Sequence, residues 1–169
     1  MKIQWLSILL LLSPLPAIAQ TGVYVSFSAS NFDLPGISWQ FGPTVGIYHD
    51  FAHAPILSAG ADLRGSFLGF GSTKSYSGLI GPRVQIRPHV LPLQPYVEGL
   101  VGVGHVEYGT GAVLTDATKF TYQLLAGVDL TIFPHIDWRV AEFSFGGFSG
   151  LEDNFHPKTV STGLVLRLP

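Results

Sequence analysis

Few residues of this sequence could carry out covalent catalysis, and few of them are spaced so that a nucleophile and a base would meet. A hydroxyl nucleophile needs a base within hydrogen-bond reach, and the best available combination is Ser149 with His156. The G-x-S-x-G turn of many serine hydrolases does not occur, because Gly147-Phe148-Ser149-Gly150 is one residue too short. We therefore expect no catalytic residue and no enzyme activity.

Four other histidines, His49, His53, His89 and His135, fall close to predicted turns. Imidazoles are common zinc ligands, but zinc sites usually bring their ligands together at closer spacing than these positions offer. We interpret the four as polar turn residues and expect no metal site. Gly102-Val103-Gly104 lies inside a predicted strand with no helix after it, so it does not predict a dinucleotide site either. No cofactor is expected.

The run from His135 to Phe148 mixes charge with large apolar side chains. Asp137, Arg139 and Glu142 are interspersed with tryptophan, valine and phenylalanine. An unpaired charge is too costly to bury in a dry core, so the run does not fit an ordinary sandwich strand. It fits a strand with hydrocarbon on one face and a wet, charged interior on the other, which is the pattern of a transmembrane β-barrel.

The N-terminus has the pattern of a signal peptide. Lys2 gives the positive start, Leu6 to Leu12 form the apolar core, and Ala17-Ile18-Ala19 precedes the expected cleavage point. The sequence therefore predicts export, with a signal peptide at 1–19 and one domain at 20–169.

The composition agrees with a membrane location. Charged residues are 12% of the chain, against about 25% in soluble domains, and the mean hydropathy is +0.37. There is no cysteine, and the loss of Lys2 shifts the formal net charge from −2 to −3, which is too small to indicate nucleic-acid binding. No run after the signal peptide is apolar for long enough to be a membrane helix. A closed barrel is the other structure that satisfies its backbone in lipid.

Eight segments have the composition of strands, and each reaches the roughly 9–11 residues that a tilted strand needs to cross hydrocarbon. The sequence thus predicts an all-β fold, an eight-stranded antiparallel up-and-down barrel with both chain ends on one side. The predicted strands are Gly22 to Ser30, Gln40 to Asp50, Ile56 to Phe67, Tyr76 to Arg87, Gln94 to Tyr108, Lys119 to Phe133, His135 to Gly146, and Thr159 to Leu168.

The connections between these segments alternate in character. Short, proline-bearing links at 51–55, 88–93 and Pro134 are typical of periplasmic turns, whereas the polar links on the other side are typical of extracellular loops. This assignment leaves His156 as the one histidine near the outer side. The predicted outer loops are 31–39, 69–75, 109–118 and 147–158.

Period-two alternation divides each segment into an apolar and a polar face. All arginines fall on the polar face and are matched there by five carboxylates, which predicts a salt-bridged interior rather than an apolar ligand-binding cavity. Glycines such as Gly46 and Gly127 should leave room for the long arginines or mark strong local curvature. Arg139 and Glu142 can both point inward only if a bulge near Ala141 interrupts the alternation. The predicted lumen network, structural or gating, is Arg64, Arg83, Arg87, Arg139, Arg167, Asp62, Glu98, Asp129, Asp137 and Glu142.

The run from Asp137 to Phe148 resembles the penultimate strand of the OmpA-like family of small outer-membrane β-barrels. Its arginine and glutamate are spaced one residue further apart than in the commonest form of that strand. The final segment, Thr162 to Pro169, is similar to the family's C-terminal assembly signal but lacks the terminal aromatic residue. The resemblance implies an outer-membrane barrel without the peptidoglycan-binding domain.

From this resemblance we expect a structural or surface-interaction role in the cell outer membrane. A narrow, porin-like diffusion channel gated by the lumen network is the alternative, and an outer-leaflet lipid-modifying enzyme is a third. The expected partners are outer-membrane lipid, the barrel-assembly machinery during insertion, and a surface ligand bound through loops 31–39, 109–118 and 147–158. We expect a monomer and no nucleic-acid partner.

Overall fold

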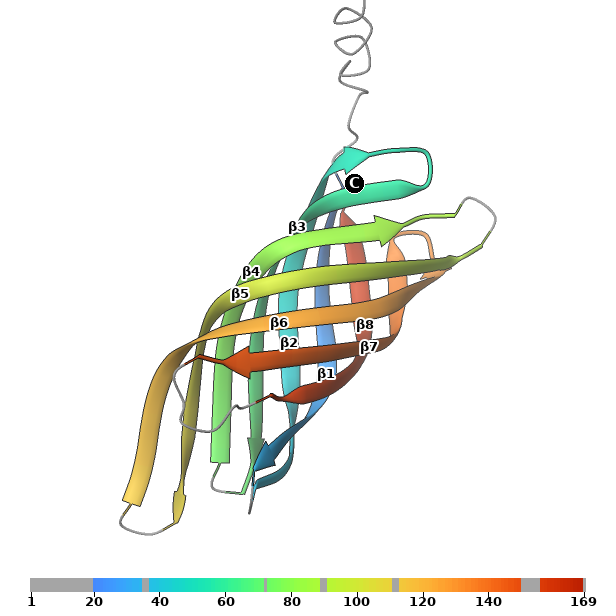
Figure 1. Ribbon diagram of the computed structural model, residues 1–169. Coiled ribbons are helices and arrows are strands. Elements are labelled where there is room, and N and C mark those ends of the chain that lie inside the picture. Colours follow the sequence, from blue (N-terminus) through green and yellow to red (C-terminus); the bar gives the residue numbers. More distant parts are fainter. Residues whose placement is uncertain are drawn as a thin grey trace, which may run out of the picture.

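A computed structural model shows the chain as one closed antiparallel barrel of eight strands, in which each strand pairs with its neighbours in the sequence and β1 pairs with β8 (Figure 1). The all-β, eight-stranded barrel predicted from the sequence is confirmed. The structure describes residues 20–34, 37–71, 73–88, 91–110, 113–149 and 156–168. The strands are β1 (Gln20–Leu34), β2 (Ile37–His53), β3 (Leu57–Phe70), β4 (Thr73–Ile86), β5 (Leu93–Thr110), β6 (Val113–Phe133), β7 (Ile136–Phe148) and β8 (Lys158–Leu168).

Each end of the barrel holds the connections of alternate strand pairs. At one end, called the inner end, lie the links β2–β3, β4–β5 and β6–β7, together with the start of β1 and the end of β8, since Thr21 pairs with Leu168. The β6–β7 link is only Pro134 and His135, and His135 has a φ of 72°. At the outer end, the β5–β6 hairpin projects beyond its neighbours (Figure 1).

The strands are longer at the outer end than the sequence predicts. β1 continues to Leu34 and β2 begins at Ile37, so most of the predicted loop 31–39 is strand. The predicted loop 109–118 is also mostly strand, since Thr110 pairs with Val113 across the hairpin. The predicted boundaries were wrong here because the polar and glycine-rich segments continue the hydrogen-bonded ladder beyond the apolar stretch. Much of the predicted loop 147–158 lies outside the described residues.

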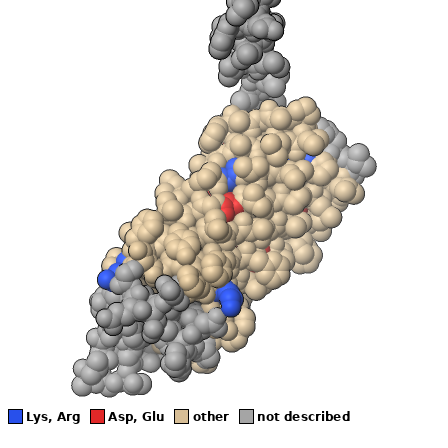
Figure 2. Space-filling view, viewed as in Figure 1, with Lys and Arg blue, Asp and Glu red and all other residues tan. Residues whose placement is uncertain are grey.

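The outward surface of the barrel, called the outer wall, is apolar. Side chains assigned to this face by alternation, such as Val25, Leu63 and Val97, are more than half exposed. Figure 2 shows a wall almost entirely of uncharged residues on the face in view. Within the described residues, no helix is long and apolar enough to cross a membrane. A barrel surrounded by lipid requires apolar side chains on its outside and keeps charged side chains in its interior.

Aromatic side chains ring both ends of the outer wall. Trp138 and Phe133 are exposed near the inner end, and Trp39, Phe120 and Phe145 are exposed near the outer end. Ring contacts link the outer aromatics of neighbouring strands into short rows, namely Phe27–Phe41–Phe70, Phe67–Tyr76–His105 and Phe145–His156.

Candidate functional site: a closed ring of charges in the lumen

All ten residues of the predicted lumen network point into the barrel. Eight of them are buried, and Arg87 and Arg167, near the inner end, are partly exposed. Alternation positions them, because every second residue of each strand faces the interior. What the sequence does not specify is which charges meet across the lumen.

Arg64 of β3 joins two carboxylates, one from β5 and one from β7 on the opposite side of the barrel. Its guanidinium lies 2.7 Å from Glu142 Oε2 of β7 and 3.5 Å from Glu98 Oε2 of β5. A second hydrogen bond from Arg64 Nη1 to Glu142 Oε1, 2.8 Å long, makes this pair bidentate. Bidentate pairs fix geometry as well as charge, so Arg64 spans the lumen in a defined position.

Two further arginines close the circuit. Arg83 pairs with Glu98 and, at 3.3 Å, with Asp129 of β6. Arg139 pairs with Asp129 at 3.1 Å and with Glu142 at 3.2 Å. Each arginine therefore contacts two carboxylates and each carboxylate contacts two arginines. The six residues form a closed, neutral ring, called the charge ring, in the order Arg64, Glu98, Arg83, Asp129, Arg139 and Glu142.

The charge ring is cut off from solvent. No side chain in it is more than 2% exposed. Removing charges from water is costly, and that cost is recovered only where pairing and hydrogen bonding are nearly complete. The alternation of three positive with three negative groups supplies that pairing.

Three tyrosines hold the arginines in place. The guanidinium carbon of Arg83 lies 3.9 Å from the ring centroid of Tyr96 and 4.2 Å from that of Tyr48. Arg139 lies 4.1 Å from the ring centroid of Tyr24. The hydroxyl of Tyr96 also donates a 2.6 Å hydrogen bond to Glu142. These cation–π contacts and hydrogen bonds restrict the arginines to the orientation that closes the ring.

Each of these tyrosines has a glycine as its direct partner on the adjacent strand. Tyr24 pairs with Gly46, and Tyr96 pairs with Gly127. A β-carbon at Gly127 would lie 2.5 Å from the Tyr96 hydroxyl, so the glycine lets the ring lie across its strand. The space at Gly46 and Gly127 was predicted to hold arginines. It holds tyrosine rings instead, and the arginines stack on those rings.

The predicted bulge in β7 is confirmed. Arg139 pairs with Gly163 of β8 and Glu142 pairs with Ser161, so two residues of β7, Val140 and Ala141, face a single residue of β8. The extra residue turns both Arg139 and Glu142 toward the lumen, and their side chains meet at 3.2 Å.

Two separate ion pairs lie between the charge ring and the inner end. Arg87 bonds to Asp50 at 2.5 Å, and Arg167 lies 3.0 Å from Asp137. Asp50 was not in the predicted network, although alternation from Tyr48 would have placed it inside.

Asp62 is the remaining carboxylate of the lumen. It accepts a 2.9 Å hydrogen bond from Tyr24, and no described arginine forms an ion pair with it. Six carboxylates therefore face five arginines in the described interior, because Asp50 joins the predicted five, and the predicted count of five carboxylates is wrong.

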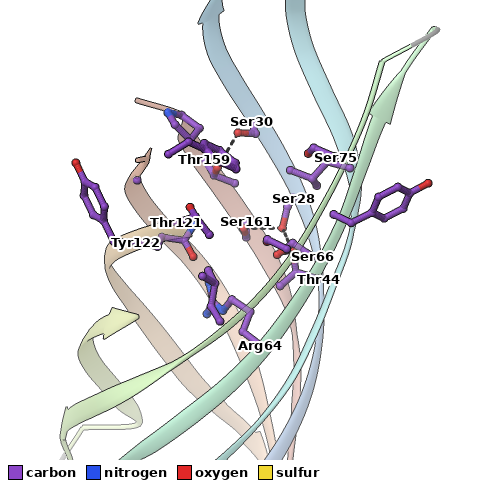
Figure 3. Close-up of a pocket in the computed structure, with 18 residues that line it drawn as sticks. Ser28, Ser30, Thr44, Arg64, Ser66, Ser75, Thr121, Tyr122, Thr159 and Ser161 are labelled. Carbon is purple, nitrogen blue, oxygen red and sulfur yellow. Dashed lines mark hydrogen bonds between the residues drawn. The ribbon is translucent and has the colours of Figure 1, made fainter. Parts of the chain in front are cut away.

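The outer half of the lumen is lined by hydroxyl groups rather than charges. Ser28 lies 2.7 Å from Thr44 and 2.8 Å from Ser161, and Thr44 donates to Ser66 at 3.0 Å. Figure 3 shows these side chains converging above Arg64. They surround a cavity of about 50 Å³, enough for one or two water molecules.

The histidines occupy scattered positions. His156 stacks on Phe145 and lies 3.3 Å from the Gly146 carbonyl oxygen, and none of its described contacts reaches Ser149. His105 also lies near the outer end, on the outer wall, so the prediction that His156 is alone there is wrong. His89 is outside the described residues. Among the described side chains, no three histidine, aspartate or glutamate residues gather as metal ligands would.

Comparison with known proteins identifies the fold. No family model matches the chain, and no curated protein matches it. Among solved structures, Neisserial surface protein A is similar with a TM-score of 0.56 and 15% identity, over 88% of this chain and 96% of that one. Ail, the attachment invasion locus protein of Yersinia pestis, has a TM-score of 0.54 and 18% identity, over 89% and 97%. The N-terminal β-barrel domain of Pseudomonas aeruginosa OprF has a TM-score of 0.56 and 12% identity, over 89% and 99%. The chain therefore has the fold of the OmpA-like small outer-membrane β-barrels.

Proposed function

We propose that the protein is an integral outer-membrane barrel with a structural or surface-interaction role and a lumen held shut by the charge ring. The observation that carries the proposal is the closed circuit of six buried charges. Each strand from β3 to β7 contributes at least one member, so the ring ties five of the eight strands together across the interior.

The charge ring is better suited to closing the lumen than to conducting ions through it. A pore lined with charge needs groups that water and ions can reach, whereas these six side chains are almost fully buried and paired with one another. In an eight-stranded barrel, side chains alone can fill the interior. The tyrosines fill the space between the guanidinium groups, which leaves the wall and the outer end as the surfaces open to partners.

The outer end is the proposed contact surface. There the strands of the β5–β6 hairpin pair all the way to Thr110 and Val113 and project from the barrel (Figure 1). The backbone of a hairpin that is hydrogen-bonded along its length is already ordered, so it loses little entropy on binding. We propose that a surface ligand binds at this end and that outer-membrane lipid surrounds the wall. We also propose that the barrel is a monomer and that the barrel-assembly machinery inserts it.

A narrow channel is the second candidate, and one observation favours it. A hydroxyl-lined cavity lies on the outer side of the ring. On the inner side lies a polar layer in which Gln85 donates to Gln94 and Gln94 donates to Thr131. The ring therefore separates two polar compartments, and its rearrangement would join them.

Single-channel recording in planar bilayers tests the two candidates. We expect no conductance steps from the wild-type protein, because the ring has no unpaired member that could move aside. Arg139→Ala opens the ring at Asp129 and Glu142, so steps from this variant alone would identify the ring as the closure. The control is Val101→Ala on the outer wall, which should stay silent. Regular steps from the wild type would overturn the closed-lumen proposal in favour of the channel.

A further inference from the structure

The outer wall carries a chain of three polar groups that the charge ring does not involve. His105 of β5 lies directly opposite Thr118 of β6, and its Nδ1 is 3.0 Å from Thr118 Oγ1. On the other side of the imidazole, Nε2 is 3.4 Å from Glu107 Oε1. We propose that these three residues form a hydrolytic site for the acyl esters of lipids around the barrel.

The neutral imidazole of His105 can make both contacts in the arrangement that this chemistry needs. With the proton on Nε2, the imidazole donates to the Glu107 carboxylate and accepts from the Thr118 hydroxyl at Nδ1. A hydroxyl bonded to a base that is itself oriented by a carboxylate is the arrangement that activates a nucleophile. The Tyr76 ring stacks on the imidazole with centroids 6.2 Å apart and limits its rotation.

The position of the site favours a lipid substrate. Thr118 is exposed, and the His105 and Glu107 side chains are 28% and 44% exposed, so all three are accessible from outside the barrel. The next outward-facing pair toward the membrane interior is Val103 and Phe120, whose residues are both more than half exposed. The reacting groups therefore stand just above the apolar wall, near the outer aromatic residues that mark the level of the headgroups. Acyl esters of membrane lipids lie at this boundary, with their chains along the apolar surface.

Hydrolysis of the ester at this site needs water as its only co-reactant. Thr118 Oγ1 would attack the ester carbonyl while its proton passes to His105 Nδ1, and Glu107 would stabilise the resulting imidazolium through Nε2. Collapse of the tetrahedral intermediate breaks the ester C–O bond, and the departing alcohol takes the proton from His105. Water, deprotonated by His105, then cleaves the acyl-threonine, which releases the fatty acid and restores the hydroxyl.

A second imidazole–hydroxyl pair in the same barrel gives a matched control. His49 Nδ1 lies 2.9 Å from Thr21 Oγ1, again on directly opposite residues of adjacent strands. This pair lies at the inner end, and no described carboxylate forms an ion pair with His49. It shares the cross-strand geometry and lacks the carboxylate, so it should have no activity.

The test measures fatty-acid release by the purified, folded protein in two kinds of vesicle. One contains lipopolysaccharide and the other phosphatidylethanolamine, so that the arms distinguish the two sources of acyl ester. Thr118→Val removes the nucleophile with little change in shape, and we expect release to fall by about 100-fold or more, the scale of acid–base and nucleophilic assistance. Thr118→Ser keeps the hydroxyl and should retain activity, and Thr21→Val should leave it unchanged. An acyl adduct of Thr118, detected by mass spectrometry after acid quench, is a further expected result.

Folding of each variant is checked by heat-modifiable gel mobility, so that loss of activity is read only from folded barrels. If wild type and Thr118→Val release fatty acid equally from both vesicles, or neither releases any, the hydrolytic site is wrong. The same holds if Thr21→Val lowers release as much as Thr118→Val. The proposed closed lumen does not depend on any of these outcomes.

Discussion

The two halves of the lumen are both polar, yet they are built from different chemistry. The inner half is organised by the charge ring, whose six ionised groups each depend on two partners. The outer half is organised by hydroxyl groups such as Ser28, Thr44 and Ser161, each of which can donate or accept. The two halves differ in how well they tolerate the loss of a hydrogen-bond or ion-pair partner. A hydroxyl that loses a partner can rotate to another or to water, whereas a buried carboxylate that loses its arginine cannot.

The magnitudes support this contrast. Breaking a buried ion pair by removing one partner costs about 3–5 kcal/mol, because an uncompensated charge remains inside. A neutral hydrogen bond contributes only about 0.5–1.5 kcal/mol net. Substitutions in the charge ring should therefore destabilise the barrel more than substitutions among the hydroxyl groups of the outer half.

The largest effect is expected for Arg83→Met. Arg83 pairs with Glu98 and Asp129 and is stacked between Tyr48 and Tyr96, so its loss leaves two buried carboxylates each with one partner fewer. We expect the free energy of unfolding, measured by urea titration in lipid vesicles, to fall by about 3–5 kcal/mol.

Arg87→Met is the control for this change. Arg87 has the same charge and faces the same lumen, but its side chain is 22% exposed near the inner end, and its loss takes an arginine from one buried carboxylate, Asp50, rather than from two. The loss should be clearly smaller than for Arg83→Met. Equal losses would mean that closure of the ring adds nothing to an ordinary lumen ion pair.

Much of the fold could be predicted from the sequence because alternation is a local property. Whether a residue faces lipid or lumen depends only on its position within its own strand, so Val25 and Arg64 could each be assigned a face without knowledge of the rest. The bulge between Arg139 and Glu142 followed from the same logic, since both charges had to be inside.

The connectivity of the candidate site could not be predicted, because it depends on register and on which strands face each other across the lumen. Arg64 and Glu142 are 78 residues apart and four strands apart in the sheet. The role of Gly127 was likewise hidden, since its partner Tyr96 is fixed only by the β5–β6 register. Asp50 was missed for a simpler reason, namely that it was treated as the end of a strand.

An intermediate effect is expected where tyrosine and glycine support the charge ring. Gly127→Ala places a methyl group 2.5 Å from the Tyr96 hydroxyl, which must move away from Arg83 and Glu142. We expect a loss of about 1–3 kcal/mol, the usual cost of overpacking. Gly78→Ala is the matched control, since its new methyl group meets no atom within 4 Å. A Gly127→Ala variant as stable as Gly78→Ala would show that the tyrosines do not hold the ring.

The smallest effect is expected in the outer half, for Ser28→Ala. The change removes two hydrogen bonds, to Thr44 and Ser161, but Thr44 keeps its bond to Ser66 and the adjoining cavity can supply water to Ser161. We expect a loss of about 1 kcal/mol in the same urea titration. Ser77→Ala is the control, because Ser77 lines the same cavity and its hydroxyl bonds to no other described side chain. If Ser28→Ala were as damaging as Arg83→Met, the hydroxyl groups would form a network as interdependent as the charge ring, and the contrast between the two halves of the lumen would fail.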